Sequence, residues 1–181
     1  MNLVLSAYLG VRGCVRLAGE MKRVKLSNRL MALVELIDEG ASVVDVGTDH
    51  GFLPVFLAQT GSVHRIFASD ISAASLKRAR QTAADHGLSE AITFFAGSGL
   101  VCVTPTQVDT IVIAGLGGES ILSILKDAPW TLSRGIKLIL QPQTKIDLLC
   151  RFLYDNGYAI MDTKSVLDRG KFYTIILALG V

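Results

Sequence analysis

The chain has 181 residues, of which 50% are hydrophobic and 19% are charged, a composition that suits one globular domain and excludes a disordered segment. It contains no apolar run of the ~18 residues needed to cross a bilayer, and its start lacks the basic n-region of a secretory signal, so we expect a cytoplasmic protein. The net charge is +2. The three cysteines are far apart and form no C-x-x-C pair, so they predict neither a disulfide framework nor a metal site.

The N-terminal part of the chain is basic. Six basic residues and one acidic residue lie between Arg12 and Arg29, a cluster that suits contact with a phosphate backbone. A solvated basic helix face is the alternative. Apolar residues then recur at helical spacing and predict a helix over Ser27–Asp38.

The rest of the chain alternates between β-rich runs and amphipathic segments. The predicted strands are Ser42–Val46, Arg65–Ser69, Ile92–Phe95, Thr110–Ala114, Lys137–Gln141, Ala159–Lys164 and Tyr173–Leu179. The predicted helices between them are Leu53–Gln59, Ala73–His86, Gly118–Lys126 and Thr144–Asn156. This order predicts an α/β fold with a doubly wound, mostly parallel seven-stranded sheet. The last two strands are too close for a crossover helix and should form an antiparallel hairpin at the sheet edge, an arrangement typical of class I methyltransferases.

A glycine turn follows the first predicted strand, in the stretch Val43-Val44-Asp45-Val46-Gly47-Thr48-Asp49-His50-Gly51. Glycines there let a ligand approach the backbone closely. The spacing of Gly47 and Gly51 does not match the dinucleotide pattern G-x-G-x-x-G, so an NAD-dependent dehydrogenase ranks last. The spacing does match the methyltransferase loop D-x-G-x-G-x-G, with Thr48 and Asp49 at variant positions. We expect Asp45 to orient this loop.

Two further loops are candidates for nucleoside contacts. Asp70 ends the second strand, where a carboxylate accepts hydrogen bonds from ribose hydroxyls; an N-cap of the next helix is its alternative role. Gly97, Ser98 and Gly99 follow the third strand, where class I methyltransferases hold the adenine of the cofactor, although a plain glycine turn would look the same.

The fourth and fifth strands end in polar or glycine-rich turns. Ala114 and Gly115 open the stretch Ala114-Gly115-Leu116-Gly117-Gly118, which exposes backbone at the carboxyl edge of the sheet. The D/N-P-P-Y/F motif of enzymes that methylate exocyclic amines is not there, which favours a ring nitrogen or another acceptor. The amides of Gln141 and Gln143 are candidates for reading a base edge.

Taken together, VDVGTDHGFLP, GSGL, IAGLGG, LILQPQ and the final GKFYTI resemble the bacterial tRNA (adenine-22-N1)-methyltransferase family, in order from about Leu26 to the end of the chain. The resemblance implies S-adenosyl-L-methionine as cofactor, tRNA as substrate and no metal, membrane or obligate protein partner. It also assigns residues 21–181 to the methyltransferase domain. Residues 1–20 have no counterpart in the family, and we expect them to reflect an upstream start codon.

The resemblance also implies roles for single residues. Asp49 stands at the position of the catalytic aspartate of the family, where a hydrogen bond from the exocyclic amino group of adenine would raise the nucleophilicity of N1. Capping of the next helix is its alternative role. His50 would position the base, or else be a buried structural histidine. Lys25, Arg29 and Arg23 are the candidates for tRNA phosphates.

The sequence departs from the family at two places. Ser98 replaces a residue that is usually acidic, so we expect the contacts with the adenine of the cofactor to differ. The helical hairpin that commonly ends family members does not follow, so we expect tRNA affinity or selectivity to differ as well. Two other functions stay open: methyl transfer to a small molecule or protein, and a non-catalytic nucleotide- or RNA-binding module of the same fold.

Overall fold

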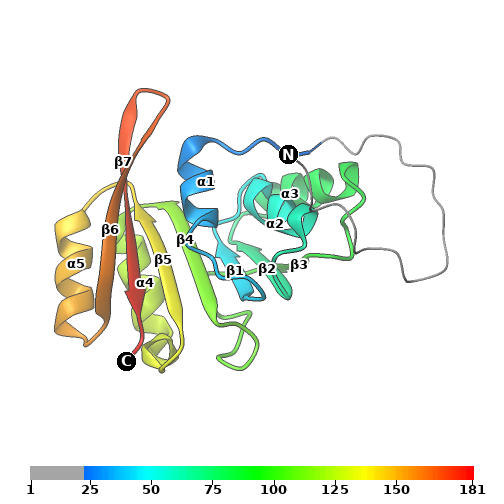
Figure 1. The fold of residues 1–181 in the computed structure, drawn as a ribbon. Helices are drawn as coiled ribbons and strands as arrows, with labels where there is room; N and C mark the ends of the chain where they lie inside the picture. Colours follow the sequence, from blue (N-terminus) through cyan, green and yellow to red (C-terminus); the bar gives the residue numbers. More distant parts are fainter. Residues whose placement is uncertain (1–22) are drawn as a thin grey trace, which may run out of the picture.

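The structure, a computed structural model, describes residues 23–181 and consists of one mixed sheet with helices on both faces (Figure 1). The predictions for Met1–Glu20, and for Arg12, Arg16 and Lys22 in the basic cluster, lie outside the described residues. In chain order the elements are α1 (Asn28–Val34), β1 (Ser42–Val46), α2 (Phe52–Thr60), β2 (Arg65–Asp70), α3 (Ala73–Asp85), β3 (Thr93–Ala96), β4 (Thr110–Leu116), α4 (Gly118–Asp127), the 3₁₀ helix η1 (Pro129–Leu132), β5 (Lys137–Pro142), α5 (Ile146–Asp155), β6 (Ala159–Asp168) and β7 (Lys171–Leu179).

The seven strands form one sheet in the order β3-β2-β1-β4-β5-β7-β6. Strands β1 to β5 are parallel, and β7 runs antiparallel to both of its neighbours, β5 and β6. The predicted doubly wound sheet and its antiparallel hairpin are therefore confirmed. Because β6 runs in the same direction as β1–β5, the tip of the β6–β7 hairpin lies at the carboxyl edge of the sheet.

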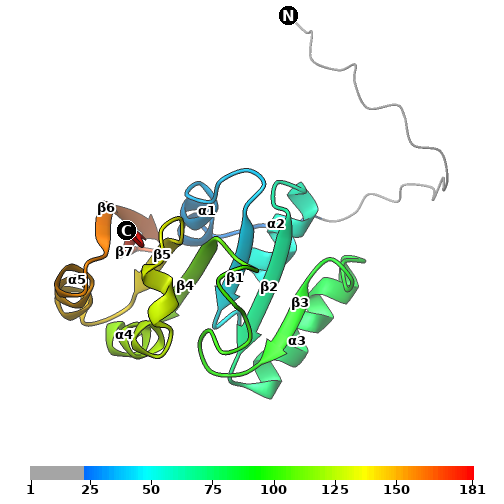
Figure 2. The same ribbon diagram turned by 90° about the horizontal axis from the view of Figure 1, so that it is seen from below.

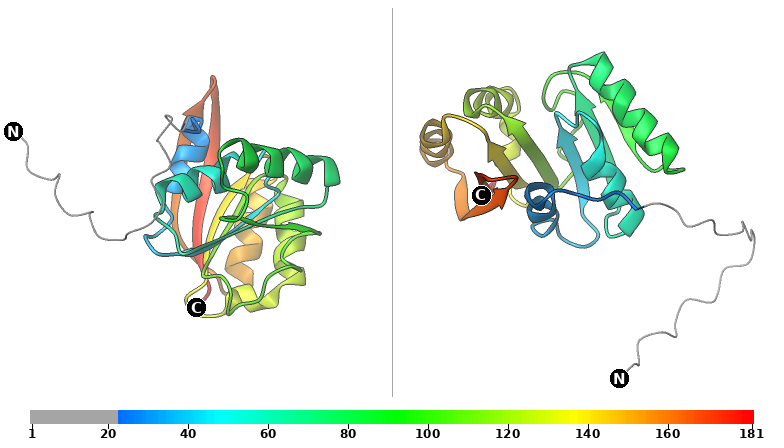
Figure 3. Two further views of the ribbon diagram at one scale, coloured as in Figure 1. Left: turned by 90° about the vertical axis from the view of Figure 1, so that its right-hand side faces the viewer. Right: turned by 90° about the horizontal axis from the view of Figure 1, so that it is seen from above.

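Alternate residues of the central strands enter two different cores. Val43 of β1 packs with α1, α2 and α3, whereas its neighbour Val44 packs with α4 and α5. The helices are accordingly divided between the two faces, and Figure 2 and the right-hand view of Figure 3 show α1 on one side of the sheet and α4 with α5 on the other. Burial of β-branched residues on both faces explains why the central strands read as continuous apolar runs.

The hairpin is longer than the sequence predicts. β6 reaches Asp168 instead of Lys164, and β7 already begins at Lys171. Arg169 and Gly170 form the turn, with φ values of 49° and 77° that suit a two-residue turn matched to the strand twist. As a result, the hairpin projects beyond the other strands, beside α1 (Figures 1 and 3).

Other elements also differ from the prediction by a residue or more at one end; β4, for example, continues to Leu116, and α5 begins at Ile146 instead of Thr144. The first helix ends at Val34 instead of Asp38, because Leu36 and Ile37 donate to carbonyls three residues back and tighten the chain into turns. The third strand is shifted by one residue to Thr93–Ala96, and the short helix η1 has no counterpart in the predicted pattern. None of these differences moves a candidate site residue off the carboxyl edge.

Candidate active site

A crevice of about 940 Å³ opens at the carboxyl edge of the sheet, within the ~300–1,000 Å³ that small-molecule sites occupy. It lies where the strand order reverses between β1 and β4, the point at which open α/β sheets bind ligands. The loops after β1, β2 and β3 line one half. The loop after β4, the start of α1 and the tip of the β6–β7 hairpin line the other half.

The loop after β1 has the backbone of a ligand cradle. Gly47, Asp49 and Gly51 have positive φ values of 77°, 47° and 71°. Gly51 is also required for packing, because a Cβ atom there would lie 2.9 Å from Cβ of Ala79 on α3. The amides of Gly47 and Thr48 both donate to the carbonyl of Ser69 at the end of β2, which ties the loop to the neighbouring strand.

Thr48 and Asp45 lie buried beneath this loop. The Thr48 hydroxyl lines the crevice and has no hydrogen-bond partner in the described chain. Burial raises the pKa of Asp45 to about 6. The nearby Thr48 hydroxyl opposes this increase in part, and the charge of Asp70 adds to it. A buried hydroxyl without a partner at the wall of a crevice is a group that a ligand would satisfy.

Asp70 is held by the backbone at the end of β2. Its Oδ2 accepts from the amide of Asp49 at 3.1 Å, and its Oδ1 accepts from the amide of Ser72 at 2.8 Å. The cap of α3 is Ser72, whose hydroxyl accepts from the amide of Ser75. Asp70 is therefore a fixed carboxylate at the wall of the crevice, and the alternative that it is the N-cap of α3 is wrong.

Asp49 and His50 lie at the exposed turn of the same loop. Oδ1 of Asp49 accepts from Nη2 of Arg78 on α3 at 2.6 Å, and its Oδ2 lies 3.7 Å from Nε2 of His50. The His50 ring stacks on Phe52 with 5.4 Å between ring centroids. His50 is exposed, so the alternative of a buried structural histidine is wrong. Both residues line the crevice as predicted, but Asp49 already has an ionic partner, Arg78, which the sequence analysis missed.

The loop after β3 closes the same half of the crevice. Gly97, Ser98 and Gly99 all line it, and Ser98 is exposed there. Gly99 has a φ of 59°, and its carbonyl accepts from the hydroxyl of Ser69 at 3.3 Å. This loop is thus held against the end of β2, next to Asp70.

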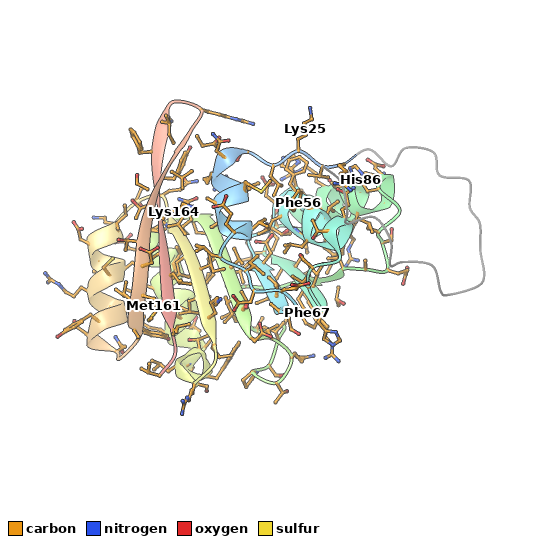
Figure 4. The ribbon with its side chains drawn as sticks, in the orientation of Figure 1. Lys25, Phe56, Phe67, His86, Met161 and Lys164 are labelled. Atoms are coloured by element: carbon orange, nitrogen blue, oxygen red, sulfur yellow. The ribbon has the colours of Figure 1, made fainter. Side chains whose placement is uncertain are left out.

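The other half of the crevice is centred on Gly115, at the irregular end of β4. Gly115 has a φ of 81°, and a Cβ atom there would lie 3.5 Å from Nη1 of Arg29 and 3.6 Å from Nε2 of Gln143. Ala114 and Lys25 line the same half. The side chain of Lys25 extends outward from the segment before α1 (Figure 4).

Arg29 joins three elements across this half. Its Nη1 donates to Oε1 of Gln141 on β5 at 2.6 Å, and its guanidinium lies 5.3 Å from the ring centroid of Tyr173 on β7. Gln141 is fully buried, and its Nε2 donates to the carbonyl of Pro142. The prediction that Gln141 reads a base edge is therefore wrong: both ends of its amide are used inside the protein, and it positions Arg29 instead.

Tyr173, Asp168 and Arg169 also line the crevice, although the sequence analysis gave them no role. They come from the hairpin, whose tip reaches the carboxyl edge only because β6 and β7 extend to their two-residue turn. The signal available in the sequence was the GKFYTI segment, which follows Arg169 directly.

Within residues 23–181, no group of three or more His, Cys, Asp or Glu side chains is arranged to hold a metal ion. None of the helices in that range is long and apolar enough to cross a membrane.

The chain is similar to known methyltransferases over most of its length. Residues 26–176 match a family model described as a methyltransferase domain. The chain is 32% identical over 158 residues to the tRNA (adenine(22)-N(1))-methyltransferase of Bacillus subtilis, covering 87% of this chain and 66% of the length of that protein.

Solved structures agree with this match. The crystal structure of the B. subtilis m1A22 tRNA methyltransferase TrmK superposes with a TM-score of 0.83 at 31% identity, covering 88% of this chain and 68% of that one. M. capricolum TrmK in complex with S-adenosyl-homocysteine superposes with a TM-score of 0.76 at 28% identity, covering 86% of this chain and 69% of that one.

Proposed function

The chain belongs to the methyltransferase domain family and, within it, to the tRNA (adenine-22-N1)-methyltransferases, and we propose that it transfers the methyl group of S-adenosyl-L-methionine to N1 of an adenine in tRNA. The observation that carries this proposal is the open crevice at the switch point, with a glycine cradle and a fixed carboxylate in one half and cationic and amide side chains in the other. Because tRNA is cytoplasmic, we place its action in the cytoplasm.

The cofactor occupies the half formed by the loops after β1, β2 and β3. The buried Thr48 hydroxyl without a partner supports this assignment, because a bound nucleoside or amino acid group would satisfy it. Asp70, oriented by two backbone amides, accepts hydrogen bonds from the ribose hydroxyls. The remaining contacts would come from Gly47 and Gly51 of the first loop, from Gly97, Ser98 and Gly99 of the third loop, and from Ala114 and Gly115 after β4. We assign to Asp45, which is buried beneath the first loop, the role of orienting that loop.

The chemistry needs alignment more than acid–base catalysis. S-adenosyl-L-methionine supplies an electrophilic methyl group, and the N1 lone pair of neutral adenine is the nucleophile, so the protein has to hold the base in line and stabilise the positive charge that develops on the ring. Asp49 and His50 project from the turn of the cofactor loop and are the side chains we propose for the reacting centre. The Arg78 ion pair fixes the orientation of Asp49 there.

The substrate half receives the target nucleotide. Gln143 and Arg29 flank Gly115 and contact the base or its phosphate, and Gln141 holds Arg29 in place from inside. Lys25 lines the crevice, Arg23 is exposed two residues earlier in the chain, and both contact tRNA phosphates. A base inside folded tRNA has to be turned out of its stack to enter this half.

Mass spectrometry of nucleosides tests the function directly. Unmodified tRNA is incubated with the purified protein and S-adenosyl-L-methionine, digested and analysed. We expect 1-methyladenosine to appear in proportion to protein, and an Asp70→Ala variant to lose it together with cofactor affinity measured by calorimetry. Binding of the cofactor without methylation of any tRNA would contradict tRNA as the substrate, and absence of cofactor binding would contradict a methyltransferase.

A further inference from the structure

The hairpin brings a second carboxylate to the crevice, in the half opposite the cofactor loops. Asp168, the last residue of β6, lines the crevice and is 8% exposed. Asp70 and Asp49, on the other side, are already engaged by backbone amides and by Arg78. The backbone of Asp168 pairs with Lys171 in the hairpin, but its side chain makes no hydrogen bond or ion pair with any residue of the described range 23–181.

Although Asp168 is mostly buried as a residue, its carboxylate oxygens stay open to the crevice. Such a group at the wall of a binding crevice is therefore a candidate for contact with a ligand. The ligand has to supply a hydrogen-bond donor, since an ionised carboxylate only accepts.

The pairing of the hairpin determines which side chains stand next to Asp168. Asp168 pairs with Lys171 and Val166 pairs with Tyr173, so these four residues share one face of the hairpin. Val166 packs into the same core as α1, which identifies this as the face toward α1. Leu167 and Phe172, on the other face, are exposed.

Two contacts between chain segments hold this face against α1. Nδ2 of Asn28 at the start of α1 donates to the carbonyl of Leu167 at 3.2 Å. Nζ of Lys164 on β6 lies 2.6 Å from Oε2 of Glu35, just after α1. The left-hand view of Figure 3 shows the hairpin beside α1. Asp168 therefore has a defined position relative to Arg29.

Arg29 and Tyr173 provide a flat surface in the same half. The guanidinium lies over the tyrosine ring, and its bond to buried Gln141 fixes its plane. Planar cationic and aromatic groups are the surfaces on which extruded bases stack. A stacking surface together with a carboxylate acceptor fits a base that carries an exocyclic amino group, and it disfavours a base with a keto oxygen at that position.

We propose that Asp168 is a catalytic residue that accepts a hydrogen bond from the exocyclic amino group of the target adenine while the base lies against Arg29 and Tyr173. This inference rests on the proposed function and transfers to Asp168 the contact that the sequence assigned to Asp49. As the bond from N1 to the methyl carbon forms, the carbon–sulfur bond breaks and its electron pair stays on sulfur. The ring becomes cationic, and the amino group, which keeps its protons, becomes a stronger donor to Asp168.

The test compares adenine with purine, which keeps N1 but has no amino group, at the target position of synthetic tRNA. Methylation rates are measured for the wild type, Asp168→Asn, Asp49→Asn and Asp162→Asn. Asp162 is the matched control, because it is an exposed carboxylate on the same strand. Calorimetry with S-adenosyl-L-methionine reports on the cofactor half separately.

For Asp168→Asn we expect the rate on adenine to fall about 10- to 100-fold, the effect of losing a charge-assisted hydrogen bond, while the rate on purine stays within about twofold of wild type. The adenine-to-purine ratio should therefore collapse in this variant and persist in Asp49→Asn and Asp162→Asn. Cofactor affinity should stay within about twofold of wild type. Asp168→Ser serves the same comparison if the asparagine variant does not fold.

Two results would overturn the inference. An unchanged adenine-to-purine ratio in both Asp168 variants would show that the carboxylate does not contact the amino group, and loss of the ratio in Asp49→Asn alone would return that contact to the cofactor loop. Failure of the proposed function looks different: the wild type itself would then methylate neither tRNA, and the inference would fall with it.

Discussion

At the scale of single residues, the burial of Asp45 beneath the candidate site lowers the stability of the folded protein at neutral pH. It is buried under the cofactor loop, and burial raises its pKa to about 6 from an ordinary value near 3.8. Between these two pH values the folded protein binds a proton that the unfolded chain has released. The contribution of Asp45 to the stability of the protein is therefore highest below about pH 4 and is lost as the pH rises through about 6.

Replacing Asp45 with asparagine should consequently stabilise the protein at neutral pH. We expect Asp45→Asn to raise the free energy of unfolding by up to ~3 kcal/mol at pH 8, with the difference shrinking toward zero below pH 4. Urea unfolding at a series of pH values measures this, with the exposed Asp162→Asn as control. A difference that does not vary between pH 4 and pH 8 would contradict the assignment to ionisation of Asp45.

A second residue-scale prediction concerns two glycines of α2. Gly51 precedes the helix and Gly61 follows it, with similar φ values of 71° and 64°. A Cβ atom at Gly51 would meet Ala79 of α3 at 2.9 Å, whereas nothing lies within 4 Å of one at Gly61. Alanine substitutions at the two glycines therefore share the same backbone strain, and only the substitution at Gly51 also disturbs the close approach of α2 and α3.

Gly61→Ala should cost about 1 kcal/mol of unfolding free energy from the left-handed backbone alone, and Gly51→Ala about 2–4 kcal/mol because α3 must also move. Gly51→Ala should in addition weaken cofactor binding, since the same loop lines the crevice. Chemical denaturation and calorimetry measure the two effects. Equal destabilisation by both substitutions would mean that the contact with Ala79 relaxes without cost.

At the scale of elements, local sequence predicted the central strands well and the hairpin poorly. β1 was predicted residue for residue, because three of the five residues of Ser42–Val46 are valines and the strand is buried on both faces. β6 is an edge strand whose residues from Met161 to Ser165 are all exposed. Its last four residues, Ser-Val-Leu-Asp, do not alternate between apolar and polar side chains, so the sequence does not mark them as strand. The end of α1 was misjudged for a related reason: apolar residues continue at helical spacing after the backbone has changed to tighter turns.

The candidate site, too, contains residues that the local sequence predicts and contacts that it does not. The glycines and Asp70 follow strand ends, where the α/β pattern alone predicts a crevice. The contact between Arg29 and Gln141 joins residues 112 positions apart, and no local pattern contains it. Gln141 resembles a polar strand end in sequence, yet in the folded chain it is completely buried and supports Arg29 from below.

This three-element contact gives a further prediction. Gln141→Leu keeps a side chain of similar size but removes the acceptor for Arg29, so the guanidinium loses its fixed plane between β5 and β7. We expect about a 10-fold loss in kcat/KM for tRNA, comparable to the loss of one hydrogen bond to a charged group, with cofactor affinity unchanged.

A double-variant comparison isolates the mechanism. Arg29→Ala should lower kcat/KM at least as much as Gln141→Leu, and combining the two substitutions should add little, because both act through the same guanidinium. Methylation kinetics of the three variants provide the measurement. Losses that multiply in the combined variant would show that Gln141 has a role independent of Arg29.

At the scale of the whole molecule, net charge does not explain how a polyanion would be held. The chain carries only +2, so attraction to tRNA has to come from where the basic residues lie. Arg23 and Lys25 are exposed in the segment that leads into α1, and Lys25 lines the crevice. Arg134, also exposed, lies three residues before the start of β5, at the opposite edge of the sheet.

This distribution predicts a position-dependent salt effect. Each phosphate contact contributes roughly 0.7–0.9 to the slope of log affinity against log salt concentration, so the combined Arg23→Ala and Lys25→Ala variant should reduce the slope by about 1–2 and weaken tRNA binding at low salt. Arg134→Ala should leave the slope unchanged. Fluorescence titrations between 50 and 300 mM salt, roughly the range where such slopes are measured, give both values. An equal decrease for Arg134→Ala would mean that tRNA is attracted by overall charge, and that the carboxyl edge alone does not orient it.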